Sequence, residues 1–172
     1  MGLLEILKYP DPILKTPAKP VVDLDENLDR FIEDMIQTMY HAPGIGLAAP
    51  QLGLSRRLIV LDPRSEQAPG GLIVLINPEI ILREGTASID EGCLSVPDYT
   101  AEVKRSARVQ VIGMDRKGKP MDLVAEDLMA IILQHEIDHL DGILFIDRLS
   151  SLKRALYKQR LKKQMARTCE IL

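Results

Sequence analysis

The chain has 172 residues, 46% of them hydrophobic, which is enough to bury one core without covalent cross-links. The net charge of −3 argues against DNA binding, and no stretch reaches the roughly 20 consecutive apolar residues that a membrane span needs. Two cysteines 76 positions apart favour a reducing compartment over a disulfide framework, and the N-terminus lacks the features of a signal peptide.

Residues 1–172 are therefore expected to form a single cytoplasmic domain. Near its start, the segment YPDPILKTPAKPV contains four prolines and should run extended over the surface. A helix should then begin at Asp25, a suitable N-cap, because apolar residues recur at helical spacing after it. These residues are Leu28, Phe31, Ile32, Met35, Ile36 and Met39. The glycines and prolines of HAPGIGLAAPQLG predict a loop next.

The second half of the chain predicts strands followed by helices. A second helix should run from about Glu126 to Asp141, where Gly142 can adopt a left-handed conformation. A basic helix should occupy about 147–167, since residues 151–172 carry a net charge of +6. Short β-branched runs predict strands at 56–62, 71–82, 107–115 and 120–125, the last two joined by the turn RKGK. This order favours an α+β fold, with antiparallel sheets packed around a central helix between N-terminal and C-terminal helices.

The central helix contains the sequence LQHEIDHLDG, which is unusually polar after the apolar run LMAIIL. His135 and His139 are four residues apart, so both side chains project from one face and can bind one metal ion. Glu136 lies one step round the helix, where it can reach a water molecule without binding the metal. A chance pattern on a solvated face would not have such apolar neighbours. The H-E-x-x-H spacing therefore predicts a metal hydrolase.

A third metal ligand is needed, and the residues alone leave its identity open. Phe145 stands where one class of H-E-x-x-H enzymes has a further histidine, and Glu170 is too close to the end of the chain to suit another class. His41 is expected to be a surface residue. Cys169 is also near the chain end, whereas Cys93 lies in the tight segment DEGCLSVPD and is either a ligand or a small buried side chain.

Three segments in this order and spacing, GIGLAAPQ, EGCLS and QHEIDH, closely resemble peptide deformylase, as do YPDPILK and HLDGILFIDRL. The resemblance implies an enzyme that removes formate from N-formyl-methionine at the start of new polypeptides. It implies Cys93, His135 and His139 as the metal ligands. Glu136 would be the general base and then the general acid, with water at the metal as the nucleophile.

The resemblance also implies the parts of the site that hold substrate. Gln51 and the Leu94 amide would stabilise the oxyanion, and the Gly46 backbone would pair with the peptide. The methionine pocket would be formed by Ile45, Ile89, Leu128, Ile131 and Ile132. The family's arginine soon after EGCLS is missing, since Tyr99 and Thr100 stand there, and Arg105 is expected to pair instead with Glu91 or Asp138.

The metal itself is not fixed by the donor set, because a thiolate with two imidazoles suits zinc, cobalt, nickel or iron(II). The resemblance implies Fe²⁺ as the native ion. The C-terminal helix is expected to pack its leucines on the domain, and its cations could also dock on the ribosome, as in the family. Two alternatives are a broader metallopeptidase and a structural zinc domain with Cys169 as a fourth ligand.

Overall fold

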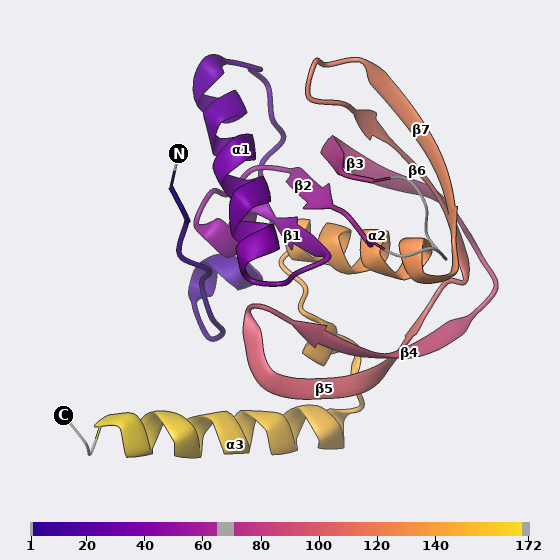
Figure 1. Ribbon diagram of the computed structural model, residues 1–172. Coiled ribbons are helices and arrows are strands. Elements are labelled where there is room, and N and C mark those ends of the chain that lie inside the picture. Colours follow the sequence, from indigo (N-terminus) through magenta and orange to yellow (C-terminus); the bar gives the residue numbers. More distant parts are fainter. Residues whose placement is uncertain (1, 65–70, 170–172) are drawn as a thin grey trace.

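In the computed structural model, the described residues form three α-helices, a five-stranded antiparallel sheet and a separate two-stranded sheet (Figure 1). The structure describes residues 2–64 and 71–169, without the side chains of residues 164, 165 and 167–169. With η for a 3₁₀ helix, the elements are η1 (Pro12–Lys15), α1 (Glu26–His41), β1 (Gly46–Ala48), η2 (Ala49–Leu52), β2 (Leu58–Leu61), β3 (Ile73–Glu84), β4 (Ala87–Cys93), β5 (Val96–Arg105), β6 (Arg108–Met114), β7 (Pro120–Glu126), α2 (Asp127–Leu140), η3 (Phe145–Arg148) and α3 (Ser151–Cys169). The predicted α+β class is confirmed.

The larger sheet has the strand order β1-β2-β3-β6-β7, with every neighbouring pair antiparallel. Four of its strands fall on the four predicted segments. The predicted hairpin is also correct, since Met114 pairs with Pro120 and Gly118 takes a positive φ of 77° in the turn between β6 and β7.

Helix α1 covers β1 and β2 on one side of this sheet (Figure 1). Its N-terminus is where the sequence placed it, because the Asp25 carboxylate accepts a hydrogen bond of 2.8 Å from the Leu28 amide. The predicted apolar stripe faces inward, and Ile32, Met35 and Met39 are almost completely buried. This packing fixes the loop that follows α1 and leads into β1.

Helix α2 crosses the middle of the molecule, between the five-stranded sheet and the β4–β5 hairpin (Figure 1). Its bounds agree with the prediction, and Gly142 has a positive φ of 70° just beyond its end. Ala130, Leu133 and Leu140 are fully buried. The helix therefore holds the histidine motif rigidly at the centre of the fold.

The β4–β5 hairpin was not predicted as strands. Its polar residues obscure the apolar alternation, yet Ala87 to Cys93 pairs with Val96 to Arg105 in a separate sheet. A register shift lies between Glu91 and Cys93, and Cys93 pairs with Val96 across the two-residue turn Leu94–Ser95. The shift is an irregularity of the kind that redirects side chains beside functional sites.

Two predictions for the N-terminal third were wrong in part. The proline-rich segment contains η1, where the Asp11 carboxylate accepts from the Ile13 amide and Leu14 is fully buried, so it is not simply an extended surface segment. The expected loop HAPGIGLAAPQLG contains β1 and η2. Gly46 to Ala48 becomes a strand because β2 offers it an antiparallel partner, which local sequence does not reveal.

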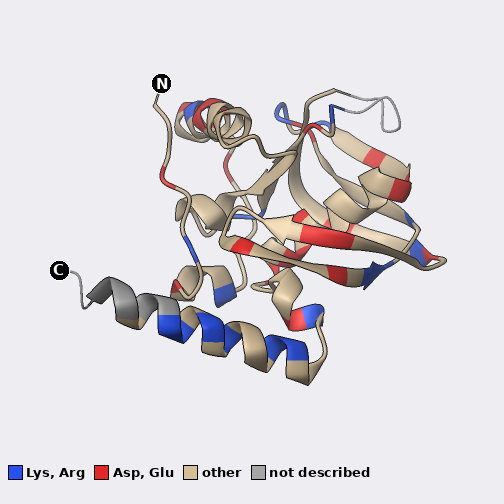
Figure 2. Ribbon diagram, turned by 60° about the horizontal axis from the view of Figure 1, so that its bottom comes forward, with Lys and Arg blue, Asp and Glu red and all other residues tan. Residues whose placement is uncertain are grey.

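The C-terminal helix α3 lies below the β4–β5 hairpin (Figure 1), and lysines and arginines recur over the part of it whose side chains are described (Figure 2). Tyr157 and Leu161 pack on the domain, but Leu152 and Leu156 are 69% and 57% exposed, so the prediction that these two leucines pack inward was wrong. The side chain of Met165 lies outside the described residues. None of the helices in the described part of the chain combines the length and apolar character needed to traverse a bilayer.

Candidate active site

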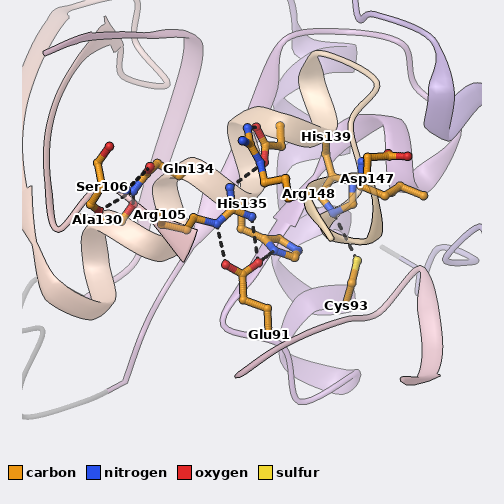
Figure 3. Close-up of polar contacts among 12 residues, drawn as sticks. Glu91, Cys93, Arg105, Ser106, Ala130, Gln134, His135, His139, Asp147 and Arg148 are labelled. Atoms are coloured by element: carbon orange, nitrogen blue, oxygen red, sulfur yellow. Dashed lines mark hydrogen bonds and ion pairs between the residues drawn. The ribbon is translucent and has the colours of Figure 1, made fainter. Parts of the chain in front are cut away.

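Cys93 comes from the end of β4, and His135 and His139 come from successive turns of α2. The possible ligand atoms of these three side chains all lie within 4.8 Å of one another. The Cys93 Sγ is 3.2 Å from the His139 Nε2, and the two imidazole centroids are 5.0 Å apart (Figure 3). The structure thus brings together one sulfur and two nitrogen donors in a metal-binding site.

The two imidazoles differ in protonation. Burial alone would lower the pKa of His135, but its hydrogen bonds to Cys93 and Glu91 raise that pKa well above its ordinary value, so a metal would have to displace a proton from this ring. His135 donates its Nδ1 hydrogen to Glu91 Oε2 at 2.8 Å, which leaves Nε2 for a metal. Burial lowers the pKa of His139 well below its ordinary value, so that ring is neutral, as a ligand must be. Its buried Nδ1 has no hydrogen-bond partner among the described residues. Donor chemistry and geometry therefore fit a divalent transition metal.

The other candidate ligands do not join this group. His41 is the last residue of α1 and is exposed, as expected of a surface residue. The side chain of Cys169 and the whole of Glu170 lie outside the described residues. Among the residues that are described, Cys93, His135 and His139 form the one cluster of three or more suitable side chains.

Glu136 is an acidic side chain of the site that has no hydrogen-bond partner, within the described part of the chain, at one of its oxygens. The residue is 5% accessible, and its Oε2 has no partner among the described residues. Burial raises the pKa of Glu136 to about 7 in the metal-free site, so its carboxyl group can both accept and release a proton near neutrality. A nearly buried carboxylate without a hydrogen-bond partner is destabilising unless a bound ion or substrate compensates its charge.

Gly46 is required for this arrangement because β1 passes directly against Glu136. A Cβ added at position 46 would lie 2.4 Å from the Glu136 Oε1. We expect Gly46→Ala to displace the carboxylate and to lower kcat/KM about 100-fold, as misplacement by ~1 Å can do. Steady-state kinetics measures this loss. Gly92→Ala is the control, since its Cβ would meet the Thr100 methyl group at an ordinary 3.4 Å; equal activity of the two variants would contradict the prediction.

Gln51 is buried and held in one orientation. Its Oε1 accepts from the Ala48 amide at 2.8 Å, so its Nε2 points toward Ser95 Oγ at 3.0 Å and Cys93 Sγ at 3.6 Å. Leu94 follows Cys93 in the β4–β5 turn. Both predicted oxyanion donors are therefore beside the thiol, and Ser95 is a neighbour that sequence reasoning missed.

A network of buried charged side chains supports His135. Arg105 donates to Glu91 Oε1 at 2.5 Å and Oε2 at 2.8 Å, and also to Asp138 Oδ2 at 2.6 Å (Figure 3). Arg105 was expected to pair with either Glu91 or Asp138, and in the structure it pairs with both. Burial alone would raise the pKa of Glu91, but its bonds to Arg105 and His135 outweigh that effect and lower it to about 2. Glu91 is therefore a carboxylate that orients His135.

Arg148 extends the network and was not predicted. It donates through Nε to Asp138 Oδ2 at 2.5 Å and through Nη2 to Asp138 Oδ1. Arg148 ends η3, so the segment before α3 is connected to the metal-binding helix. The sequence signal that could have revealed it is Asp138, an acid within the buried helix α2, which needs a cationic partner.

A cleft of about 580 Å³ opens onto the site. Its walls include every residue predicted for the methionine pocket, and also Gly46, Gln51, Leu94, His135 and Glu136. Tyr99 and Thr100 line it where the resemblance led one to look for an arginine. Pro43, Asp90, Val96 and Asp98 line it as well and were not predicted, since nothing in their local sequence marks them.

Two histidines and a thiolate in an α+β fold, with a free carboxylate beside them in an open cleft, define a metal-dependent hydrolase. Comparison with known proteins narrows this class. The Polypeptide deformylase family profile matches residues 3–155. The chain belongs to the peptide deformylase family, whose members are enzymes that remove formate from N-formyl-methionine.

Individual relatives agree over almost the whole chain. A peptide deformylase of Syntrophobacter fumaroxidans is 52% identical over 165 residues, which span 96% of this chain and 97% of that protein. One of Thermodesulfovibrio yellowstonii is 52% identical over 162 residues, or 94% and 98% of the two chains. The crystal structure of a peptide deformylase from Legionella pneumophila is similar with a TM-score of 0.88 and 45% identity, covering 98% of each chain.

Proposed function

We propose that this chain deformylates N-formyl-methionyl polypeptides with Glu136 as the group that carries the proton. The observation behind this proposal is the unpartnered, buried Glu136 beside Cys93, His135 and His139 at the floor of the cleft. The whole chain, residues 1–172, would serve as one catalytic domain.

The three ligands would hold the ion, which supplies a Lewis acid that makes water acidic enough to ionise near neutral pH. Glu136 accepts a proton from the attacking water, whose oxygen adds to the formyl carbon. Glu136 then returns that proton to the amide nitrogen, the C–N bond breaks, and formate and a free methionyl amine are released.

Negative charge develops on the formyl oxygen during the attack. The Gln51 Nε2 and the Leu94 amide are the proposed donors to it, since both lie next to Cys93 in the cleft wall. Because the Ala48 amide holds the Gln51 Oε1, the Gln51 Nε2 is directed toward Cys93 before the charge appears. A single donor of this kind is worth about 3–4 kcal/mol in the transition state.

Substrate would be held by its methionine side chain and its backbone. Leu128, Ile131 and Ile132 present aliphatic surface from α2, and Ile45 and Ile89 stand 39% and 37% exposed at the cleft. Gly46 lies on β1, an edge strand of the sheet, where an extended peptide can add as a further strand.

A comparison of formyl-Met-peptide with acetyl-Met-peptide tests this substrate class. A site closed around a formyl hydrogen should reject the extra methyl group, so the acetyl substrate is expected to react at least about 100-fold more slowly. Cleavage of internal peptide bonds at a comparable rate would favour a broader metallopeptidase. Metal-loaded protein that turns over neither substrate, with or without Glu136, would favour a structural zinc domain.

Ferrous iron is the proposed native ion, with zinc, nickel and cobalt able to occupy the same donors. An oxidisable ion bound by a thiolate is sensitive to oxygen. Purification in air is therefore expected to lose activity, and preparation with nickel or cobalt is expected to keep it. Metal analysis with parallel assays measures this, and full activity of a zinc-only preparation would contradict it.

Formylated nascent chains are the proposed partners, in the cytoplasm, and α3 is a proposed contact to the ribosome. Its exposed cations suit a phosphate-rich surface (Figure 2). Glutamate at Lys153, Lys158 and Lys162 should weaken cosedimentation with ribosomes without changing activity on a free peptide. Unchanged cosedimentation would remove this partner. Truncation is a poorer test, because it would also delete the buried Tyr157.

A further inference from the structure

Three consecutive residues near the N-terminus donate to three backbone carbonyls beside the active site. The Leu7 amide donates to the Gln51 carbonyl at 2.8 Å, and the Tyr9 amide donates to the Ser95 carbonyl at 2.8 Å. Between them, Lys8 Nζ donates to the Leu94 carbonyl at 2.5 Å. Residues 7–9, here called the strap, thus bind both segments that carry the proposed oxyanion donors.

These two segments are distant in sequence. Gln51 belongs to η2, which follows β1, whereas Leu94 and Ser95 form the turn of the β4–β5 hairpin in the other sheet. A side-chain hydrogen bond from Gln51 to Ser95 joins them directly. The strap adds three further hydrogen bonds, one to the η2 segment and two to the β4–β5 turn. All three acceptors are backbone carbonyls, so the strap links the two segments through their backbones.

We propose that the strap sets the relative position of the two oxyanion donors, and that Lys8 is a positioning residue acting through Leu94. This inference rests on the proposed roles of Gln51 and the Leu94 amide. Lys8 is exposed and is not among the residues that line the cleft, so its ammonium group acts on the turn and not on substrate.

The strap is itself anchored on both sides of Lys8. Leu7 and Tyr9 pack against the core cluster that contains Val96, Phe145 and Tyr157. The Tyr9 ring lies 6.3 Å from the Tyr157 ring, centroid to centroid. Because the backbone on both sides of Lys8 is anchored, the bond to the carbonyl costs side-chain rotamer freedom but no further backbone freedom.

The bond from Lys8 also bears on Cys93. The Leu94 carbonyl and the Ser95 amide are the two ends of one planar peptide group. The Ser95 N–H donates to Cys93 Sγ at 3.4 Å. Lys8 at one end and the thiol at the other therefore fix the plane of this peptide. The Leu94 N–H belongs to the preceding peptide group, and the fixed plane restrains it through the Leu94 Cα that the two groups share.

Lys8→Met tests the inference in the full-length, metal-loaded enzyme, because methionine keeps the aliphatic stem and removes the donor. We expect kcat to fall about three- to tenfold, the range of one hydrogen bond, with KM and metal content unchanged. Amide hydrogen exchange should accelerate at residues 93–96 and 49–52. Lys8→Arg, which restores a donor, should recover most of kcat.

Lys117→Met, on the exposed turn between β6 and β7, is the matched control and should behave as the unmodified enzyme. The proposal would be overturned if the Lys8→Met variant had the same kcat and the same amide hydrogen exchange as this control. It would also be overturned if only KM changed. A Gln51→Ala variant distinguishes failure of the oxyanion-donor assignment from failure of the proposed role of the strap. If Gln51→Ala keeps full kcat, the assignment of the oxyanion donors fails; if it lowers kcat while Lys8→Met does not, only the strap fails.

Discussion

A Glu136→Gln variant is expected to keep its metal and its fold while losing about 10²- to 10⁴-fold in kcat. Glutamine matches the size of glutamate but cannot take a proton from water. The Glu136 Oε2 makes no hydrogen bond to a described residue, so the exchange breaks no structural contact at that atom. Single-substrate kinetics on formyl-Met-peptide, with metal content measured on the same sample, provides the test.

Glu102→Gln on β5 is the matched control for this change, since Glu102 is an exposed strand residue facing solvent. It should leave kcat within about twofold, as surface substitutions usually do. A Glu136→Gln enzyme with full turnover would refute the proton-transfer role. A variant that is inactive because it lacks metal would show instead that Glu136 supports the ion, and would also contradict the proposal.

Arg105→Met is expected to destabilise the protein by about 3–5 kcal/mol, because it leaves the Glu91 carboxylate buried without its arginine and removes one of the two arginines that bind Asp138. The Arg105 side chain is 1% exposed, so water cannot replace it. Loss of the bond that fixes Glu91 should also weaken the orientation of His135 and reduce metal affinity about 10- to 100-fold. Urea denaturation and metal titration measure the two effects.

Arg108→Met is the control for Arg105, because Arg108 also bonds a glutamate, Glu84, but with 44% of its side chain exposed. Such a surface pair is worth at most about 1 kcal/mol. If the two variants unfold at the same urea concentration, or if Arg105→Met retains full metal affinity, the charge network has no part in holding the site.

Local patterns in the sequence were sufficient for the helices and for two of the three ligands. The α1 stripe, the Asp25 cap and the four-residue spacing of His135 and His139 depend on helical geometry alone. Cys93 could be assigned only through the resemblance, since bringing it to α2 requires the β4–β5 hairpin to fold across that helix. No spacing in the sequence encodes this long-range contact.

The errors have the same origin. Gly46 to Ala48 reads as a loop until β2 pairs with it, and β4 reads as polar because its residues serve the site as well as the sheet. Leu152 and Leu156 satisfy a helical apolar pattern, yet the contact surface of α3 is set by Tyr157 and Leu161, which meet the domain. In each case the structure was determined by how helices and strands pair and pack with one another, and not by the local propensity of the residues within them.

The neighbouring rings of Tyr9, Tyr99 and Tyr157 beside the cleft provide an intrinsic spectroscopic probe of substrate binding. The chain has no tryptophan and four tyrosines, so tyrosine governs its near-ultraviolet spectrum. Tyr99 lines the cleft, and its ring lies 4.6 Å from that of Tyr157, which in turn meets Tyr9. A peptide that settles against Tyr99 changes the surroundings of this coupled group. Occupancy can thus be followed by circular dichroism or emission without an attached dye.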